Sequence, residues 1–202
     1  MAWDKKFWDD LFEGGREYYP VNRVYFDLLM GRLVEKVGRE PKSGLDIACG
    51  TGQLAQLLAE RGLTVAARDL STVALGKAAE RFEKMPDVGA RVTLGEVDFD
   101  RLDPEDVRER FDLIFIKLAY TFVAAKPRFL RWVKASLRDG GVFVLMTPVL
   151  AEGYEHDDFE KKISVPRREA EKLLRAEFSD VEIFHEFYPG ETGGHVDYLL
   201  TP

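Results

Sequence analysis

The sequence predicts a Rossmann-like α/β fold with a seven-stranded, mostly parallel sheet, an antiparallel last strand and helices on both faces. Strand-like apolar runs alternate with helical segments through most of the 202 residues, which is typical of a parallel sheet. The last two strand-like runs are joined by residues 189–194. A parallel crossover needs a longer connection, so the last strand is predicted to run antiparallel to its predecessor.

The N-terminal residues are predicted to be helical. A stripe of large apolar side chains recurs at helical spacing: Trp3, Phe7, Trp8, Leu11 and Phe12. Gly14 and Gly15 end this helix, and a second helix is predicted over residues 21–37. We expect residues 1–40 to form a helical cap on a core that spans residues 41–202.

The core elements alternate between strand and helix up to the last two strands, which follow each other directly. The predicted strands cover residues 44–48, 64–69, 90–97, 111–117, 142–147, 181–187 and 195–201. The predicted helices cover residues 52–61, 71–84, 129–137 and 166–177, with a short helix at 104–109. Residues 148–165 are acidic and poorly periodic, and the stretch 148–166 is interpreted as an insertion that adds to the cap. The whole chain is predicted to be a single domain.

Composition and charge narrow the class of protein. The chain is 46% apolar without a long apolar run, so we expect a globular protein that does not enter a membrane. A net charge of −7 disfavours broad nucleic-acid binding. A lone cysteine, Cys49, and a start without a signal-peptide pattern favour a cytoplasmic location. Few Asn and Gln residues beside 32% charged residues favour a thermophilic source.

A glycine turn follows the first predicted strand. Gly50 and Gly52 can adopt backbone angles closed to other residues and let a ligand approach the main chain. Asp46 adds a negative charge, which suits a cationic ligand better than a pyrophosphate. The segment also matches Gly-x-Gly-x-x-Ala with Ala55 last, so a nicotinamide or flavin dinucleotide stays an alternative here.

Acidic residues stand at three successive strand ends of this pattern. Asp46 precedes the glycine turn, Asp69 ends the second strand, and Asp98 with Phe99 follows the third. This combination resembles the class I S-adenosylmethionine-dependent methyltransferases. In this sequence, Ala48 stands where the family usually has the first glycine of its turn. Residues 111–115 and 137–141 resemble the family's fourth strand and the turn before its fifth.

The resemblance implies S-adenosyl-L-methionine as cofactor and a role for each acid. Asp46 helps to hold the methionine end, Asp69 binds both ribose hydroxyls, and Asp98 accepts from the adenine amino group while Phe99 packs on the ring. Arg23 is a candidate partner of the ligand carboxylate. The other predicted cofactor contacts are Tyr19, Ala48, Cys49, Gly50, Gly52, Leu70, Lys117 and Leu118.

Methyl transfer requires few catalytic groups from the protein, because the sulfonium of the cofactor already carries an activated methyl group. A base is needed only if the acceptor must lose a proton, and no catalytic motif is predicted. The candidates are His195, Tyr120 and Tyr154. His185 is interpreted as a packed strand residue, and His156 beside two aspartates lacks metal-ligand spacing, so no metal site is predicted.

These observations predict a methyltransferase that acts on a small-molecule acceptor. We expect the acceptor pocket between the N-terminal aromatic segment and residues 148–165. Two alternatives stay open at this point: an NAD(P)-dependent oxidoreductase, and a non-catalytic module that binds an adenosyl ligand. The acceptor and the oligomeric state are not predicted.

Overall fold

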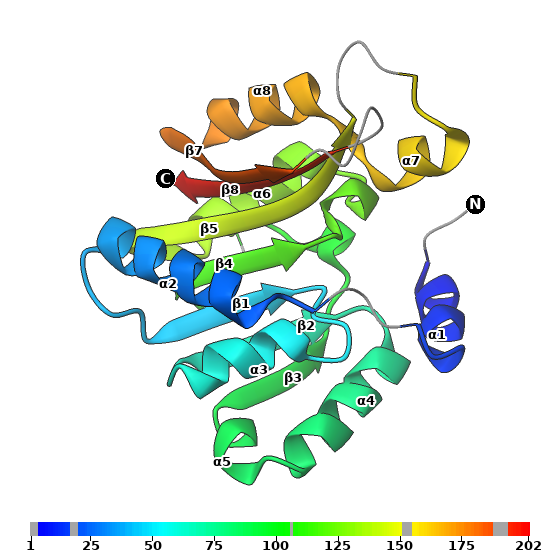
Figure 1. Ribbon diagram of the computed structural model, residues 1–202, viewed down its shortest axis with the longest axis vertical. Helices are drawn as coiled ribbons and strands as arrows, with labels where there is room; N and C mark the ends of the chain where they lie inside the picture. Colours follow the sequence, from blue (N-terminus) through cyan, green and yellow to red (C-terminus); the bar gives the residue numbers. More distant parts are fainter. Residues whose placement is uncertain (1–3, 17–19, 106, 151–154, 188–193) are drawn as a thin grey trace. The chain divides into compact units, whose positions relative to one another are not determined.

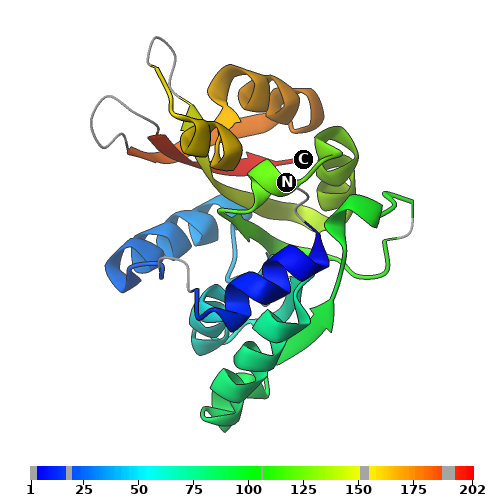
Figure 2. The same cartoon turned by 90° about the vertical axis from the view of Figure 1, so that its right-hand side faces the viewer.

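A computed structural model describes residues 4–16, 20–105, 107–150, 155–187 and 194–202 (Figure 1). The chain divides into two compact units, Met1–Phe99 and Asp100–Pro202, each with its own strands and helices. Figure 2 shows the same ribbon from a perpendicular direction. The single domain with a cap built from residues 1–40 and 148–166 stays a prediction.

The first unit is built on three parallel strands. They are β1 (Ser43–Ile47), β2 (Thr64–Asp69) and β3 (Val92–Glu96), in the order β3-β2-β1. Ile47, Val65 and Ala67 are fully buried in these strands. Because parallel strands end at the same edge of a sheet, the residues that follow β1, β2 and β3 are brought together there.

Five helices accompany these strands: α1 (Lys5–Glu13), α2 (Arg23–Val37), α3 (Gln53–Glu60), α4 (Thr72–Glu83) and α5 (Pro86–Gly89). Side chains of the residues before them fix three of the starts. The carboxylate of Asp4 accepts from the Phe7 amide, the side chain of Asn22 from two amides of α2, and the Ser71 hydroxyl from the Ala74 amide. Gly38 ends α2 in the left-handed conformation, at a φ of 74°.

The second unit combines parallel and antiparallel pairs. Strands β4 (Phe111–Lys117) and β5 (Leu137–Leu150) are parallel, whereas β8 (Gly194–Thr201) runs antiparallel to both β5 and β7 (Asp180–Phe187). The order is β4-β5-β8-β7, and the two-residue β6 (Val165–Pro166) pairs with the end of β5. The predicted antiparallel last strand is thereby confirmed.

The helices of this unit are α6 (Lys126–Ala135), α7 (Asp158–Ile163) and α8 (Arg167–Glu177), with short 3-10 turns at η1 (Phe99–Arg101), which begins at the last residue of the first unit, and η2 (Tyr120–Phe122). Helices α6 and α8 pack against each other. Under them lies an aromatic core in which Phe143 contacts both Phe129 and Phe178, with ring centroids 6.4 and 5.9 Å apart.

The predicted fold class is confirmed as a mostly parallel, Rossmann-like sheet with helices, and the short β6 adds a strand to the seven predicted. The predicted helix at 104–109 is wrong for the described residues of that stretch. The Asp103 carboxylate accepts from the Glu105 amide at 3.0 Å, which makes a local turn there in place of a helix.

Two other expectations change in the second unit. The strand predicted at 142–147 begins at Leu137, because polar residues 138–141 form an irregularity within the strand rather than a break before it. The poorly periodic insertion contains α7, where Asp157 and Glu160 form a reciprocal capping box that starts the helix. Residues 151–154 lie outside the described part of the chain.

Candidate cofactor site

The glycine turn after β1 has the backbone that the sequence predicts, with one addition. Gly50 and Gly52 take positive φ angles of 53° and 78°. Ala48 also adopts the left-handed region, at a φ of 54°. A residue with a β-carbon is strained there, by roughly 1–2 kcal/mol. The replacement of glycine by alanine at this position therefore preserves the turn at a cost in stability.

Asp69 lies at the end of β2 with both carboxylate oxygens fixed by the main chain. Its Oδ2 accepts from the Gly50 amide and its Oδ1 from the Ser71 amide, each at 2.8 Å. Only 6% of the residue is exposed, and this burial raises the pKa of the carboxyl although the backbone amides of Ser71, Gly50 and Leu70 act to lower it. A carboxylate has about four acceptor sites, so the backbone amides do not use all of them.

Asp46 holds the other side of the same turn. It is 2% exposed, and its Oδ2 accepts from the Ala55 amide in the first turn of α3 at 3.1 Å. The negative charge therefore lies at the positive end of that helix. Two amides of the segment, those of Gly50 and Ala55, are thus already bound by carboxylates of the chain.

Aromatic side chains of the protein lie beside both glycines of the turn. A β-carbon on Gly50 would lie 3.5 Å from the Phe12 ring, and one on Gly52 would lie 3.0 Å from the Phe82 ring. The approach of a ligand to the main chain at these glycines stays a prediction. Cys49 is buried, and burial first, then the charges of Asp46 and Asp69, raises the pKa of its thiol well above the usual range. It is not a reactive thiol.

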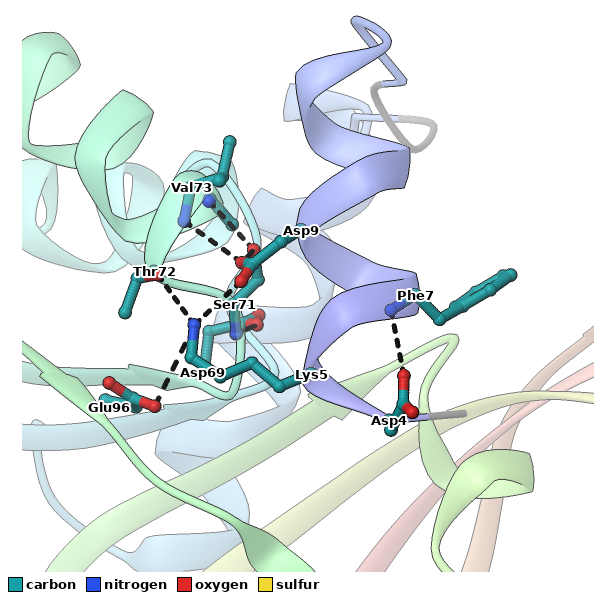
Figure 3. A network of polar contacts seen from close by, with 10 residues as sticks. Asp4, Lys5, Phe7, Asp9, Asp69, Ser71, Thr72, Val73 and Glu96 are labelled. Atoms are coloured by element: carbon teal, nitrogen blue, oxygen red, sulfur yellow. Dashed lines mark hydrogen bonds and ion pairs between the residues drawn. The ribbon is translucent and has the colours of Figure 1, made fainter. Parts of the chain in front are cut away.

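Helix α1 is bound to the start of α4 by a polar network (Figure 3). The Asp9 Oδ1 accepts from the Ser71 hydroxyl at 2.7 Å and from the Val73 amide at 3.3 Å. Lys5 Nζ donates to Asp9 at 2.8 Å and to Thr72 at 2.6 Å. Desolvation opposes ionisation of Asp9, yet the bonds from Lys5 and Ser71 outweigh it and lower the pKa of this carboxyl.

This network reaches the predicted ribose acid through Ser71. The Ser71 amide binds Asp69, while its hydroxyl binds Asp9 of α1. At the other end of α1, Lys77 of α4 donates to the Phe12 carbonyl, and the buried Phe12 ring lies against Gly50. The sequence predicts an aromatic stripe in this helix but not its two anchors on α4. They depend on contacts more than 60 residues apart in the chain.

The remaining predicted residues of the first unit lie in two places. The Val97 amide donates to the Asp69 carbonyl at 2.9 Å, which ties the loop that carries Asp98 to the end of β2, and both Asp98 and Phe99 are half-buried. Leu70, also half-buried, follows Asp69 directly. Arg23 has a 69% exposed side chain and pairs with Glu60 at 2.7 Å. Its contact with a ligand carboxylate stays a prediction.

Tyr19 and Tyr154 lie outside the described residues. In the second unit, Lys117 ends β4 and Leu118 follows with a φ of 61°, a strained backbone for leucine. Tyr120 is fully buried, and no described residue hydrogen-bonds its hydroxyl. Burial raises the pKa of this hydroxyl far above its ordinary value. Tyr120 is therefore corrected from candidate base to core residue.

His195 has a partner that the sequence reasoning missed. Its Nε2 lies 2.6 Å from Oδ1 of Asp197, a carboxylate whose side chain is 4% exposed. The sequence does contain a signal for this pair, because His195 and Asp197 are two residues apart and such residues of a strand point to the same face. Elsewhere, the described residues contain no cluster of three or more potential metal ligands. None of the described helices has the length and apolar character needed to cross a bilayer.

Comparison with known proteins decides the family. A family model described as "Methyltransferase domain" matches residues 18–191. The chain belongs to this methyltransferase family. The match includes the glycine turn, β2 and the loop after β3, so the predicted resemblance is confirmed.

Relatives of this methyltransferase domain carry related names. It is 30% identical over 134 residues to a malonyl-[acyl-carrier protein] O-methyltransferase of Paenibacillus, covering 63% of this chain and 47% of that protein. It is 28% identical over 140 residues to a ubiquinone biosynthesis O-methyltransferase of Agrobacterium fabrum, covering 65% and 54%. The chain thus spans about half the length of the curated relatives it matches.

A solved structure supports the fold over the whole domain. A methyltransferase of Geobacter sulfurreducens in complex with S-adenosyl-L-homocysteine superimposes with a TM-score of 0.70, over 98% of this chain and 99% of that one. The sequence identity is 14%. At that level the likeness shows the shared fold.

Proposed function

We propose that the chain is an S-adenosylmethionine-dependent methyltransferase that acts on a small molecule and binds its cofactor at the glycine turn of the first unit. The observation that carries the proposal is the use of the turn amides. Asp69 binds the Gly50 amide and Asp46 binds the Ala55 amide. A dinucleotide pyrophosphate needs such amides free at the helix start, whereas a cationic sulfonium is favoured by the two carboxylates.

The residues present fit the adenosyl cofactor in two further respects. The carboxylate of Asp69 at the end of β2 suits the two ribose hydroxyls, because carboxylate oxygens accept hydrogen bonds. Asp98 and Phe99 follow the neighbouring strand, and their loop is tied to Asp69, which supports the adenine role. When bound, the cofactor supplies an activated methyl group. The protein's task is then to orient the acceptor and to exclude water.

The relatives favour an oxygen acceptor, since both carry O-methyltransferase names. Membership of the methyltransferase family disfavours the NAD(P)-dependent oxidoreductase. A measurement of methyl transfer to an acceptor distinguishes the enzyme from the non-catalytic module, which would bind an adenosyl ligand without turnover. A cytoplasmic location and a thermophilic source belong to the same proposal, supported by the cysteine usage and by the scarcity of amide side chains.

Thermal unfolding with four ligands tests the cofactor assignment. We expect S-adenosylhomocysteine at about 100 times its Kd to stabilise the protein by about 2.7 kcal/mol, a rise in Tm of roughly 5–10 °C. S-adenosylmethionine should act similarly, while NAD and NADP leave Tm unchanged. A rise with NAD or NADP alone overturns the assignment.

A further inference from the structure

Ser71 is bound both to the glycine-turn site and to helix α1. Its amide donates to Oδ1 of Asp69 at 2.8 Å, and its hydroxyl donates to Oδ1 of Asp9 at 2.7 Å (Figure 3). Ser71 is fully buried, so neither bond is exchanged with bulk water. One residue thus connects the carboxylate at the end of β2 with a carboxylate of α1.

The Ser71 side chain is fixed relative to its own main chain. Its hydroxyl oxygen accepts from the Ala74 amide at 3.1 Å as the cap of α4, and its single hydroxyl hydrogen is donated to Asp9. Asp9 also accepts from the Val73 amide at 3.3 Å. Asp9 therefore holds the first turn of α4 at the residues that directly follow Asp69.

The same network reaches the neighbouring strand through Lys5. Its Nζ donates to Asp9 at 2.8 Å and to Thr72 at 2.6 Å. It also lies 4.0 Å from Oε1 of Glu96, the last residue of β3. In the parallel register of β2 and β3, Glu96 pairs with Asp69. Helix α1 is thereby tied to the ends of both strands, where the proposed ribose and adenine contacts begin.

We propose that Asp9 is a positioning residue of the cofactor site: it fixes Ser71, and Ser71 orients the Asp69 carboxylate toward the ribose. This inference rests on the proposed binding of the cofactor at the glycine turn. Asp9 acts through Ser71 and not by contact with the ligand. A carboxylate that is ordered before binding loses less freedom on binding, which raises affinity. By linkage, the cofactor then stabilises the docked α1 by the factor by which docking raises affinity.

The next ion pair of α1 provides a matched control. Lys6 and Asp10 have the same four-residue spacing and lie 2.6 Å apart, but their side chains are 79% and 61% exposed. Asp10→Ala therefore removes the same charge from a pair that faces solvent. Asp9→Asn is the conservative variant, because its amide oxygen still accepts from the Ser71 hydroxyl.

Calorimetric titration with S-adenosylhomocysteine measures the effect on affinity. Asp9→Ala should raise the Kd about 5–10-fold at an unchanged stoichiometry, which shows that the variant is folded. Asp9→Asn should raise it by no more than about threefold, and Asp10→Ala should stay within about twofold. A wild-type Kd in Asp9→Ala, or an equal loss in Asp9→Asn and Asp9→Ala, overturns the positioning role.

A double-mutant cycle tests the route through Ser71. In the Ser71→Ala background the hydroxyl that Asp9 holds is absent, so Asp9→Ala should weaken S-adenosylhomocysteine binding further by only about twofold or less. A loss of the same size in both backgrounds overturns this route.

Hydrogen exchange of the α1 amides tests the reciprocal effect. These amides exchange through local opening of the helix, so the ligand protects them only if docking and binding are coupled. Saturating S-adenosylhomocysteine should slow their exchange about 5–10-fold in the wild type and in Asp10→Ala, and clearly less in Asp9→Ala. Wild-type exchange that the ligand leaves unchanged overturns the coupling. A wild type that does not bind S-adenosylhomocysteine overturns the proposed function itself, whereas binding without these differences overturns only the role of Asp9.

Discussion

Asp69 and Asp197 are both buried aspartates on strands, yet their partners are of opposite kinds. Asp69 binds two backbone amides, which do not titrate, and so it fixes the shape of a turn. Asp197 faces two histidine side chains, with His195 Nε2 2.6 Å from its Oδ1 and His185 Nδ1 3.9 Å from its Oδ2. One carboxylate holds main-chain amides of a turn, and the other contacts side chains of a hairpin.

This difference explains what the sequence could predict. The glycine turn and the acids at the strand ends are local patterns, so the sequence could place Asp46, Asp69 and Asp98 at successive strand ends, whereas their roles toward the cofactor come from the family resemblance and stay predictions. The double use of Asp69 could not be predicted, because it depends on the Gly50 amide 19 residues away. The docking of α1 through Asp9 and the pairing of His185 with Asp197 likewise depend on distant contacts. Ala48 illustrates a further limit, since its left-handed backbone is strain that the sequence does not display.

The largest expected effect is on Asp69. In Asp69→Ala the Gly50 and Ser71 amides lose their buried acceptor, so the free energy of unfolding should fall by about 3 kcal/mol. Asp69→Asn keeps one carbonyl acceptor and should lose about half as much. Chemical denaturation measures both. A folded Asp69→Ala variant of wild-type stability would show that the carboxylate does not hold the turn.

Two lysine–aspartate pairs of α1 provide a smaller, matched comparison. Lys5–Asp9 is docked on α4, whereas Lys6–Asp10 has the same spacing with side chains 79% and 61% exposed. Asp9→Ala should lower the unfolding free energy by about 1–2 kcal/mol, and Asp10→Ala by less than about 0.5 kcal/mol. Urea denaturation and hydrogen exchange of the α1 amides check this. Equal effects of the two substitutions would contradict the docking.

The pH dependence of the same pair has a defined sign. The pKa of Asp9 is lowered in the folded protein, so its contribution is complete above the ordinary aspartate pKa of about 3.9. It is lost as the pH falls through the lowered value. The stability difference between the wild type and Asp9→Ala should therefore be constant near neutral pH and shrink only in acid. A difference that shrinks between about pH 8 and pH 6 would point to another group, such as a histidine.

The smallest expected effect is a gain at Ala48. Glycine relieves the left-handed strain but adds freedom to the unfolded chain, so Ala48→Gly should stabilise the protein by no more than about 1 kcal/mol, or about 2–4 °C in Tm. Ala55→Gly, in the first turn of α3, is the control and should destabilise. A loss of stability in Ala48→Gly would show that the alanine is not strained.

Calorimetric titration with S-adenosylhomocysteine tests the contrast between the two aspartates most directly. The protein is compared as wild type, Asp69→Asn and His195→Gln at neutral pH. Asp69→Asn should bind about 10-fold or more weakly, because charge-assisted bonds to the ribose are lost, while His195→Gln should bind within twofold of the wild type. Wild-type affinity in Asp69→Asn, or a comparable loss in His195→Gln, would contradict the placement of the cofactor at the glycine turn.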